Sequence, residues 1–239
     1  IEDGPEAVYD ESAVQVQEVV FVLDRFGYCK LLDKSTYERN QETVDTEQVH
    51  AIRCLNTDKI CLFAASGSLY QIKAMDVPAG KLRDKGVPIE NLSKYDGTKD
   101  SIVYLTCAQD LKGATLVFAT KMAMVKQVPA EEFETNNRMV AATKLQDGDQ
   151  VVSILPVEGQ EEVVLQTTSG VFLRFPLEEI SVLKKASRGV RGIKLAKNEE
   201  LEKLYLIGDN PVIDYKGKEV HMNRLKLAKR DGKGSKVRL

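Results

Sequence analysis

The sequence predicts an all-β fold of about five similar four-stranded units, arranged like the blades of a propeller-like disc. Three observations support this: a repeated strand–turn–strand pattern, a regular spacing of the turns, and the lack of a long amphipathic helix. Four segments share the pattern clearly and a fifth shares it more weakly. The segments are residues 19–37, 60–78, 115–133, 163–180 and 211–227.

The turns of these five hairpins are regularly spaced. The turn positions are Gly27, Gly67, Ala123, Gly170 and Gly217, separated by 40, 56, 47 and 47 residues. That period suits a four-stranded propeller blade. Glycine is the expected turn residue because hairpin turns often require a positive φ. Ala123 therefore predicts a turn of another type, or an alignment that is shifted by one residue.

A second element recurs between the hairpins: a polar or acidic turn followed by a short apolar strand. Residues 97–105, 146–155 and 198–207 are examples, so each unit is expected to supply about four strands. One such unit cannot bury both faces of its sheet, whereas neighbouring units can bury each other's faces. No stretch with a 3.6-residue period exceeds about two turns, so helix should be minor. We expect the units to span residues 16–57, 58–112, 113–159, 160–207 and 208–239.

Composition places the chain among folded, soluble intracellular proteins. Of its 239 residues 43% are apolar and 29% are charged, which allows a core and argues against disorder. No apolar run approaches the roughly 20 residues of a membrane span, and we find no signal peptide, so no membrane partner is expected. The acidic residues 1–15 contain Gly-Pro and open on Ile1 without an initiator Met. They predict a linker from an upstream domain that this sequence does not include.

Motifs for catalysis and for metal binding are not found. Cys29, Cys54, Cys61 and Cys107 lack CxxC spacing, and we expect them to be small buried hydrophobic residues in a reducing compartment. The two histidines lie far from any second metal ligand in the sequence. No P-loop, nucleophile elbow or Cys/His pair is present. We therefore predict no catalytic residue, no metal and no cofactor for this domain.

Charge is segregated along the chain. Residues 181–239 contain 16 Lys and Arg against 7 Asp and Glu, a net charge of +9, whereas residues 1–180 carry −11. Such asymmetry suggests a polyanionic partner, because Lys and Arg gain affinity for nucleic acid by releasing condensed counterions. The candidate DNA-binding residues form three groups. They are Lys184, Lys185, Arg188, Arg191 and Lys194, then Arg224, Lys229, Arg230, Lys233 and Lys236, and finally Lys81, Arg83 and Lys85.

The central group has a spacing that supports two interpretations. Arg188, Arg191 and Lys194 recur at intervals of three, and Gly189 and Gly192 permit turns that bring them together. The glycines would also let backbone N–H groups approach an anion closely. In the alternative interpretation the glycines serve only turns between units, and the basic side chains are merely solvated.

Residues 186–195 (ASRGVRGIKL) closely resemble a segment that recurs in the C-terminal domains of the A subunits of bacterial DNA gyrase and topoisomerase IV. Residues 86–92 (GVPIENL) and 27–30 (GYCK) with 35–37 (STY) are also similar to that family. The resemblance extends over nearly the whole chain from about residue 16. It implies a β-pinwheel, a propeller-like disc whose blades exchange their outer strands and whose rim binds and bends DNA.

One departure from the family concerns the first unit. The first blade of gyrase carries a basic box of the form Gln-Arg-Arg-Gly-Gly-Lys-Gly, which chiral wrapping of DNA requires. Here residues 38–47 (ERNQETVDTE) are mainly acidic, and a similar element occurs instead at residues 229–236, with Asp231 where the box has glycine. The missing first-unit box, together with five rather than six units, favours topoisomerase IV over gyrase.

The resemblance implies a non-catalytic domain that binds and bends DNA and presents it to a catalytic core. The implied partners are double-stranded DNA, the upstream core of the same chain and the ATPase B subunit of an ATP-dependent type IIA topoisomerase. The implied location is the cytoplasm, in association with the nucleoid. Two alternatives stay open: a gyrase A wrapping domain, and a propeller scaffold for protein interactions. The scaffold predicts binding that depends little on salt.

Overall fold

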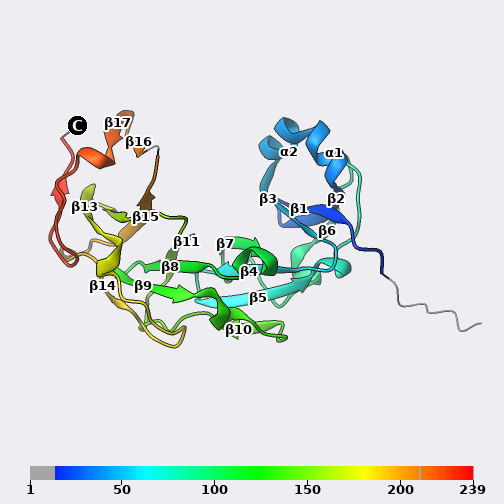
Figure 1. The fold of residues 1–239 in the computed structure, drawn as a ribbon, viewed down its shortest axis with the longest axis horizontal. Coiled ribbons are helices and arrows are strands. Elements are labelled where there is room, and N and C mark those ends of the chain that lie inside the picture. Colours follow the sequence, from blue (N-terminus) through cyan, green and yellow to red (C-terminus); the bar gives the residue numbers. More distant parts are fainter. Residues whose placement is uncertain (1–13, 210, 239) are drawn as a thin grey trace, which may run out of the picture.

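Four four-stranded antiparallel sheets follow one another along an arc, and a two-stranded hairpin ends the array (Figure 1). This computed structural model describes residues 14–209 and 211–238. The predicted all-β, propeller-like architecture is confirmed, although the fifth unit has only two strands in its own sheet. The linker predicted for residues 1–15 lies almost entirely outside the described residues.

The sheets, named A to D in chain order, each run from the concave side of the arc to its convex side. Sheet A contains β3 (Gln48–Leu55), β1 (Glu18–Asp24), β2 (Tyr28–Asp33) and β6 (Val87–Pro88). Sheet B contains β7 (Ile102–Cys107), β4 (Lys59–Ala64), β5 (Ser68–Lys73) and β10 (Met139–Ala141). Sheet C contains β11 (Val151–Pro156), β8 (Thr115–Thr120), β9 (Met124–Pro129) and β14 (Val190–Arg191). Sheet D contains β15 (Leu201–Ile207), β12 (Glu162–Thr167), β13 (Val171–Pro176) and β18 (Ser235–Lys236).

The remaining elements are short. The terminal hairpin consists of β16 (Val212–Tyr215) and β17 (Lys218–His221). The helices are α1 (Lys34–Arg39), α2 (Gln41–Glu47) and α3 (Ala108–Leu111). Single 3₁₀ turns are η1 (Ala74–Asp76), η2 (Ile89–Asn91), η3 (Ala130–Phe133), η4 (Leu177–Glu179) and η5 (Met222–Arg224). No helix among the described residues is long and apolar enough to cross a membrane.

Each sheet takes its outermost strand from the unit that follows it in the sequence. Strand β6 follows the β4–β5 hairpin in the chain, yet it pairs with β2 of sheet A. Strands β10, β14 and β18 complete sheets B, C and D in the same way. Each neighbour therefore holds an edge that the preceding unit would otherwise expose. Figure 1 shows β10, β14 and the C-terminal segment along the outside of the arc.

The cores lie between the sheets, because side chains alternate between the two faces of each strand. Phe21 of sheet A and Leu62 of sheet B share one core, which also contains Cys29. The opposite face of sheet B places Phe63 against Phe118 of sheet C, with ring centroids 6.3 Å apart. A third cluster joins sheets C and D. Every central strand is thus buried on both faces, as the unit-stacking argument requires.

Caps cover the two outer faces of the array. At one end α1 and α2 place Tyr37 and Val44 over Val20 of sheet A. At the other end Met222 and the terminal hairpin cover Phe172 of sheet D. The caps cover the faces of sheets A and D that no further four-stranded sheet covers, and the two ends do not meet in Figure 1. The described residues therefore form an open arc rather than a closed disc, as expected of repeat arrays with capped ends.

The turn at Ala123 corrects one expectation from the sequence. Ala123 adopts φ +62° and its N–H donates to Thr120 O at 2.9 Å. Gly67 adopts φ +85° and makes the same bond to Ala64 O, also at 2.9 Å. The turn is therefore of the same type and the alignment is not shifted. A left-handed alanine costs roughly 1–2 kcal/mol, which burial of its methyl group between sheets C and D partly offsets.

The four cysteines predict a loss of stability at alkaline pH. Burial raises the pKa of Cys29 and Cys61 to about 12 and that of Cys54 to about 11, and it also raises the pKa of Cys107. The unfolded thiols ionise near their ordinary pKa of 9.0. Their stabilising contribution is therefore complete below about pH 9 and is lost as the pH rises towards 12. The free energy of unfolding, measured by urea titration, should fall above pH 9. The fall should be shallower by about 1.4 kcal/mol per pH unit in Cys61→Ala; an unchanged slope would contradict this account.

Candidate nucleic-acid interface

Three equivalent loops lead into exchanged strands on the convex rim. We call them rim loop A (residues 79–86, before β6), rim loop C (182–189, before β14) and rim loop D (227–234, before β18). Each begins at a parallel bridge to the second hairpin strand of the sheet that it joins. Each also contains one turn with the same hydrogen bond. The N–H groups of Asp84, Ser187 and Gly232 donate to Lys81 O, Lys184 O and Lys229 O at 3.0, 3.1 and 3.3 Å.

The three rim loops share two basic positions. The third residue is lysine in each loop, and the residue before the final glycine is Lys or Arg. The six residues are Lys81, Lys184 and Lys229 at the first position and Lys85, Arg188 and Lys233 at the second, and all six are exposed. All six were predicted from the sequence as single basic residues, but their common pattern, Lys-x-x-x-Lys/Arg-Gly, was not recognised.

The final glycine of each rim loop permits a close approach between backbones. Gly86, Gly189 and Gly234 all have positive φ angles. A Cβ atom at these positions would lie 2.2, 2.5 and 2.7 Å from the carbonyl oxygens of Cys29, Val125 and Phe172. Gly192 is also buried, and its N–H donates to Ala123 O at 2.7 Å, so that amide is not available to an anion. These glycines therefore pack one unit against another, while the neighbouring basic side chains stay exposed.

Rim loop D lies beside the segment that follows rim loop C. Lys194 N–H donates to Gly232 O at 2.9 Å, and Asp231 N–H donates to Gly192 O at 2.8 Å. Arg230 is half-buried and its Nη1 donates to Arg191 O at 2.7 Å. The structure thus brings the two predicted C-terminal groups together into one basic surface. Arg224, Lys236 and Arg238 are exposed as well, whereas Lys185 is half-buried.

Arg191 differs from its neighbours because its guanidinium binds a carboxylate. Its Nε and Nη2 both donate to Asp231, with 2.8 Å between Nη2 and Oδ2. The hydrogen bonds from Arg191 lower the pKa of Asp231, and Asp231 in turn raises the pKa of Arg191. The Arg191 side chain remains 56% exposed. Its positive charge is therefore accessible but partly neutralised.

The Arg191–Asp231 pair predicts a gain of affinity for DNA on removal of one charge. Asp231→Asn keeps a side chain that tolerates the local φ of +66° and frees Arg191 for phosphate. We expect tighter duplex binding and a salt slope that is steeper by about 0.9. The measurement is a filter-binding or anisotropy titration at several salt concentrations. The control Glu42→Gln makes the same charge change on exposed α2, at the other end of the arc. Equal gains in both variants would show that only net charge matters.

The basic surface is interrupted at sheet B. The segment before β10, residues 134–138, is shorter than the rim loops and follows η3, which contains Glu131 and Glu132. Its Arg138 donates to Leu92 O at 2.9 Å. Rim loop A, with exposed Lys81, Arg83 and Lys85, is therefore separated along the arc from rim loops C and D. The structure joins two of the three predicted groups and leaves the third apart.

Aromatic side chains that sequence reasoning missed lie beside rim loop A. Lys85 Nζ is 4.2 Å from the centroid of the Tyr28 ring. Phe26, at the tip of the β1–β2 hairpin, is 71% exposed, and Arg25 Cζ lies 4.7 Å from its ring centroid. The signal in the sequence is the Arg25-Phe26 pair directly before the turn glycine Gly27.

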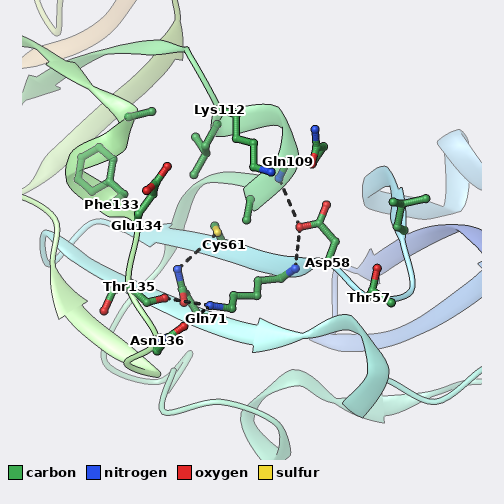
Figure 2. Close-up of a pocket in the computed structure, with 15 residues that line it drawn as sticks. Thr57, Asp58, Cys61, Gln71, Gln109, Lys112, Phe133, Glu134, Thr135 and Asn136 are labelled. Carbon is green, nitrogen blue, oxygen red and sulfur yellow. Dashed lines mark hydrogen bonds between the residues drawn. The ribbon is translucent and has the colours of Figure 1, made fainter. Parts of the chain in front are cut away.

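A pocket of about 560 Å³ lies on the surface of the second and third units (Figure 2). Lys59 Nζ donates there to Thr135 O at 3.1 Å and to Asn136 Oδ1 at 2.9 Å. Asp58 Oδ1 accepts hydrogen bonds from the backbone N–H groups of Lys59 and Gln109. Lys59 thus holds the segment before β10 against sheet B. None of the predicted DNA-binding residues lines this pocket.

Comparisons with known proteins agree on one family. Residues 114–158 and 161–207 match the family model described as the DNA gyrase C-terminal domain, beta-propeller. The DNA gyrase A subunits of Staphylococcus aureus strains MRSA252 and NCTC 8325 are each 27% identical to this chain over 254 aligned positions. The alignments cover 98% of this chain but 29% and 28% of those relatives. The chain therefore spans under a third of their length.

Solved structures show the same fold. The C-terminal domain of a DNA topoisomerase IV has a TM-score of 0.81 at 22% identity and covers 93% of this chain and 73% of its own. The C-terminal domain of E. coli ParC has a TM-score of 0.74 at 15% identity and covers 93% and 94%. A DNA gyrase A C-terminal domain has a TM-score of 0.62 at 20% identity and covers 92% and 76%. This chain therefore has the β-pinwheel fold, and it is similar in sequence and in structure to the C-terminal domains of gyrase A and topoisomerase IV.

Proposed function

We propose that this domain binds duplex DNA along its convex rim and bends it. The observation that carries the proposal is the threefold repetition of a rim loop with two exposed basic positions. Duplex DNA presents phosphates at regular intervals, so a repeated basic loop suits a repeated anion. Contacts of this kind position the duplex without reading its bases. Binding should therefore be largely independent of sequence, apart from a preference for DNA that bends easily.

The unequal units support simple bending over chiral wrapping. Helices α1 and α2 occupy the stretch of the first unit where gyrase has its basic box. The acidic η3 segment separates rim loop A from the other two. Bending DNA costs energy that contacts between the rim and phosphates must offset. Because this rim offers fewer such contacts, the bound DNA path should be short. We propose a topoisomerase IV-like role, with a gyrase-like wrapping domain as the alternative.

The proposal places this domain within a larger enzyme. We propose that it needs no catalytic residue, metal or cofactor of its own and presents DNA to the catalytic core upstream in the same chain. Its further partner would be the ATPase B subunit of a type IIA topoisomerase in the cytoplasm, associated with the nucleoid. The curated relatives support such a context, because they are gyrase A subunits more than three times the length of this chain.

A topology assay tests the proposal. Nicked circular DNA is religated in the presence of increasing protein, and the linking number is measured next to a salt titration of duplex binding. We expect binding that weakens steeply with salt and a linking number that stays unchanged at saturation. A linking number that shifts in one direction would replace bending by gyrase-like wrapping. Binding that is absent or insensitive to salt would favour the protein-interaction scaffold.

A further inference from the structure

Two buried lysines lie beneath rim loops A and C. Lys30 of β2 is 4% exposed and Lys126 of β9 is 1% exposed. Each follows its hairpin turn residue, Gly27 or Ala123, by three positions. They therefore occupy equivalent places in two units. A buried ammonium group is costly unless every donor finds an acceptor, so the atoms that surround it need an explanation.

The acceptors are three backbone carbonyls of the adjacent rim loop. Lys30 Nζ donates to Lys81 O, Leu82 O and Asp84 O at 2.9, 2.7 and 2.6 Å. Lys126 Nζ donates to Lys184 O, Lys185 O and Ser187 O at 3.3, 2.9 and 2.7 Å. The same three loop positions are used in both units, and the three donors of each ammonium group are all satisfied. Burial lowers the pKa of both lysines, that of Lys126 to about 8.

The three carbonyls form a cage around each ammonium group. This cage determines which side of the rim loop faces outward. Three carbonyl oxygens, which would repel a phosphate, are directed inward and bound to a positive charge. The exposed Lys81 and Lys85 flank the caged carbonyls of rim loop A, and Lys184 and Arg188 flank those of rim loop C. The loop therefore presents cations outward and keeps its partial negative charges underneath.

The other two sheets lack the cage. The equivalent residues are Tyr70 in sheet B and Leu173 in sheet D, both buried. The segment at sheet B is too short to be a rim loop. Rim loop D is held instead from its other side, through Lys194 N–H and Gly232 O. Leu173 also shows that an apolar side chain fits this position beneath a rim loop, with its Cδ1 3.3 Å from where a Gly232 Cβ would lie.

We propose that Lys30 and Lys126 are positioning residues for DNA binding, each of which holds a rim loop in its phosphate-binding conformation without touching DNA. The proposal rests on the proposed function. It assigns a role to side chains that are closed off from solvent and therefore from any direct contact with a duplex. It also divides the rim into two caged loops and one loop that is held by its neighbour.

The test replaces each caged lysine by methionine, which fills the same space without donors. In Lys126→Met we expect about tenfold weaker binding of a 40-base-pair duplex and a salt slope reduced by about 1.8, because Lys184 and Arg188 both lose their positions. Lys30→Met should act likewise through Lys81 and Lys85. The control Lys203→Met removes one exposed charge from β15 on the concave side and should leave the slope unchanged.

Hydrogen exchange separates positioning from a general loss of stability. The N–H of Ser187 is bonded within rim loop C, and it should exchange faster in Lys126→Met while amides of β8 and β12 stay protected. The reciprocal result is expected for Asp84 in Lys30→Met. Unchanged protection of both loops together with an unchanged salt slope would overturn the proposal. If the unmodified domain binds no DNA, the proposed function fails, and loop protection still shows whether the lysines order the loops.

Discussion

Replacing Arg188, Lys194, Lys229 and Lys233 by alanine should weaken duplex binding on the order of a thousandfold at 0.15 M salt. All four side chains are exposed. Arg188 lies on rim loop C, Lys229 and Lys233 lie on rim loop D, and Lys194 lies on the segment that follows rim loop C and is bonded to rim loop D. Each phosphate contact contributes about 0.9 to the salt slope, so the slope should fall by about 3.6. The loss should be the same for unrelated sequences, because phosphate contacts carry no base information.

The choice of these four residues depends on the structure. The triplet that the sequence alone suggested includes Arg191, whose charge Asp231 already partly neutralises. The variant Arg188→Ala, Arg191→Ala, Lys194→Ala should therefore lose less than three full contacts. A charge-matched control replaces four exposed lysines away from the rim loops: Lys99, Lys112, Lys203 and Lys218. Comparable losses in the control and in the rim variant would rule out a rim-specific path.

Gly189→Ala should destabilise the fold by several kcal/mol or prevent folding. The added Cβ would lie 2.5 Å from Val125 O, and the backbone has φ +91°. The neighbouring atom belongs to the backbone of β9, which is buried on both sides and cannot yield as a side chain would. Strain of this kind is among the few causes of large single-residue effects. Strand β14 would have to leave sheet C to relieve it.

Gly113→Ala provides the matched control for this effect. Gly113 also has a positive φ, +71°, but a Cβ there would meet nothing within 4 Å. It should cost only the roughly 1–2 kcal/mol of a left-handed alanine. Urea unfolding of both variants gives the comparison. Similar losses at the two sites would mean that the contact with Val125 is easily relaxed and that strand exchange does not depend on it.

The sequence determined the repeat and the places of most exposed basic residues. Hairpin turns and strand alternation are local properties, so the turns at Gly27, Gly67 and Gly170 could be predicted from the sequence. The basic residues of the rim loops were found for a similar reason, because charge that clusters in the chain also clusters on a surface loop. Their equivalence was visible as well, in the pattern Lys-x-x-x-Lys/Arg-Gly, but it had to be sought across all units at once.

Tertiary structure decided what depends on residues far apart in the chain. Asp231 pairs with Arg191 from 40 residues away, and Lys126 donates to three carbonyls that lie 58 to 61 residues away. In the sequence Lys126 is simply a lysine on a strand, which is normally exposed. The open shape of the arc could not be predicted from the sequence either, because it depends on how α1–α2 and β16–β17 cover the outer faces of sheets A and D. Local chemistry fixes turns and strand faces, but only long-range hydrogen bonds and packing decide which loop covers a charge and where an array of units stops.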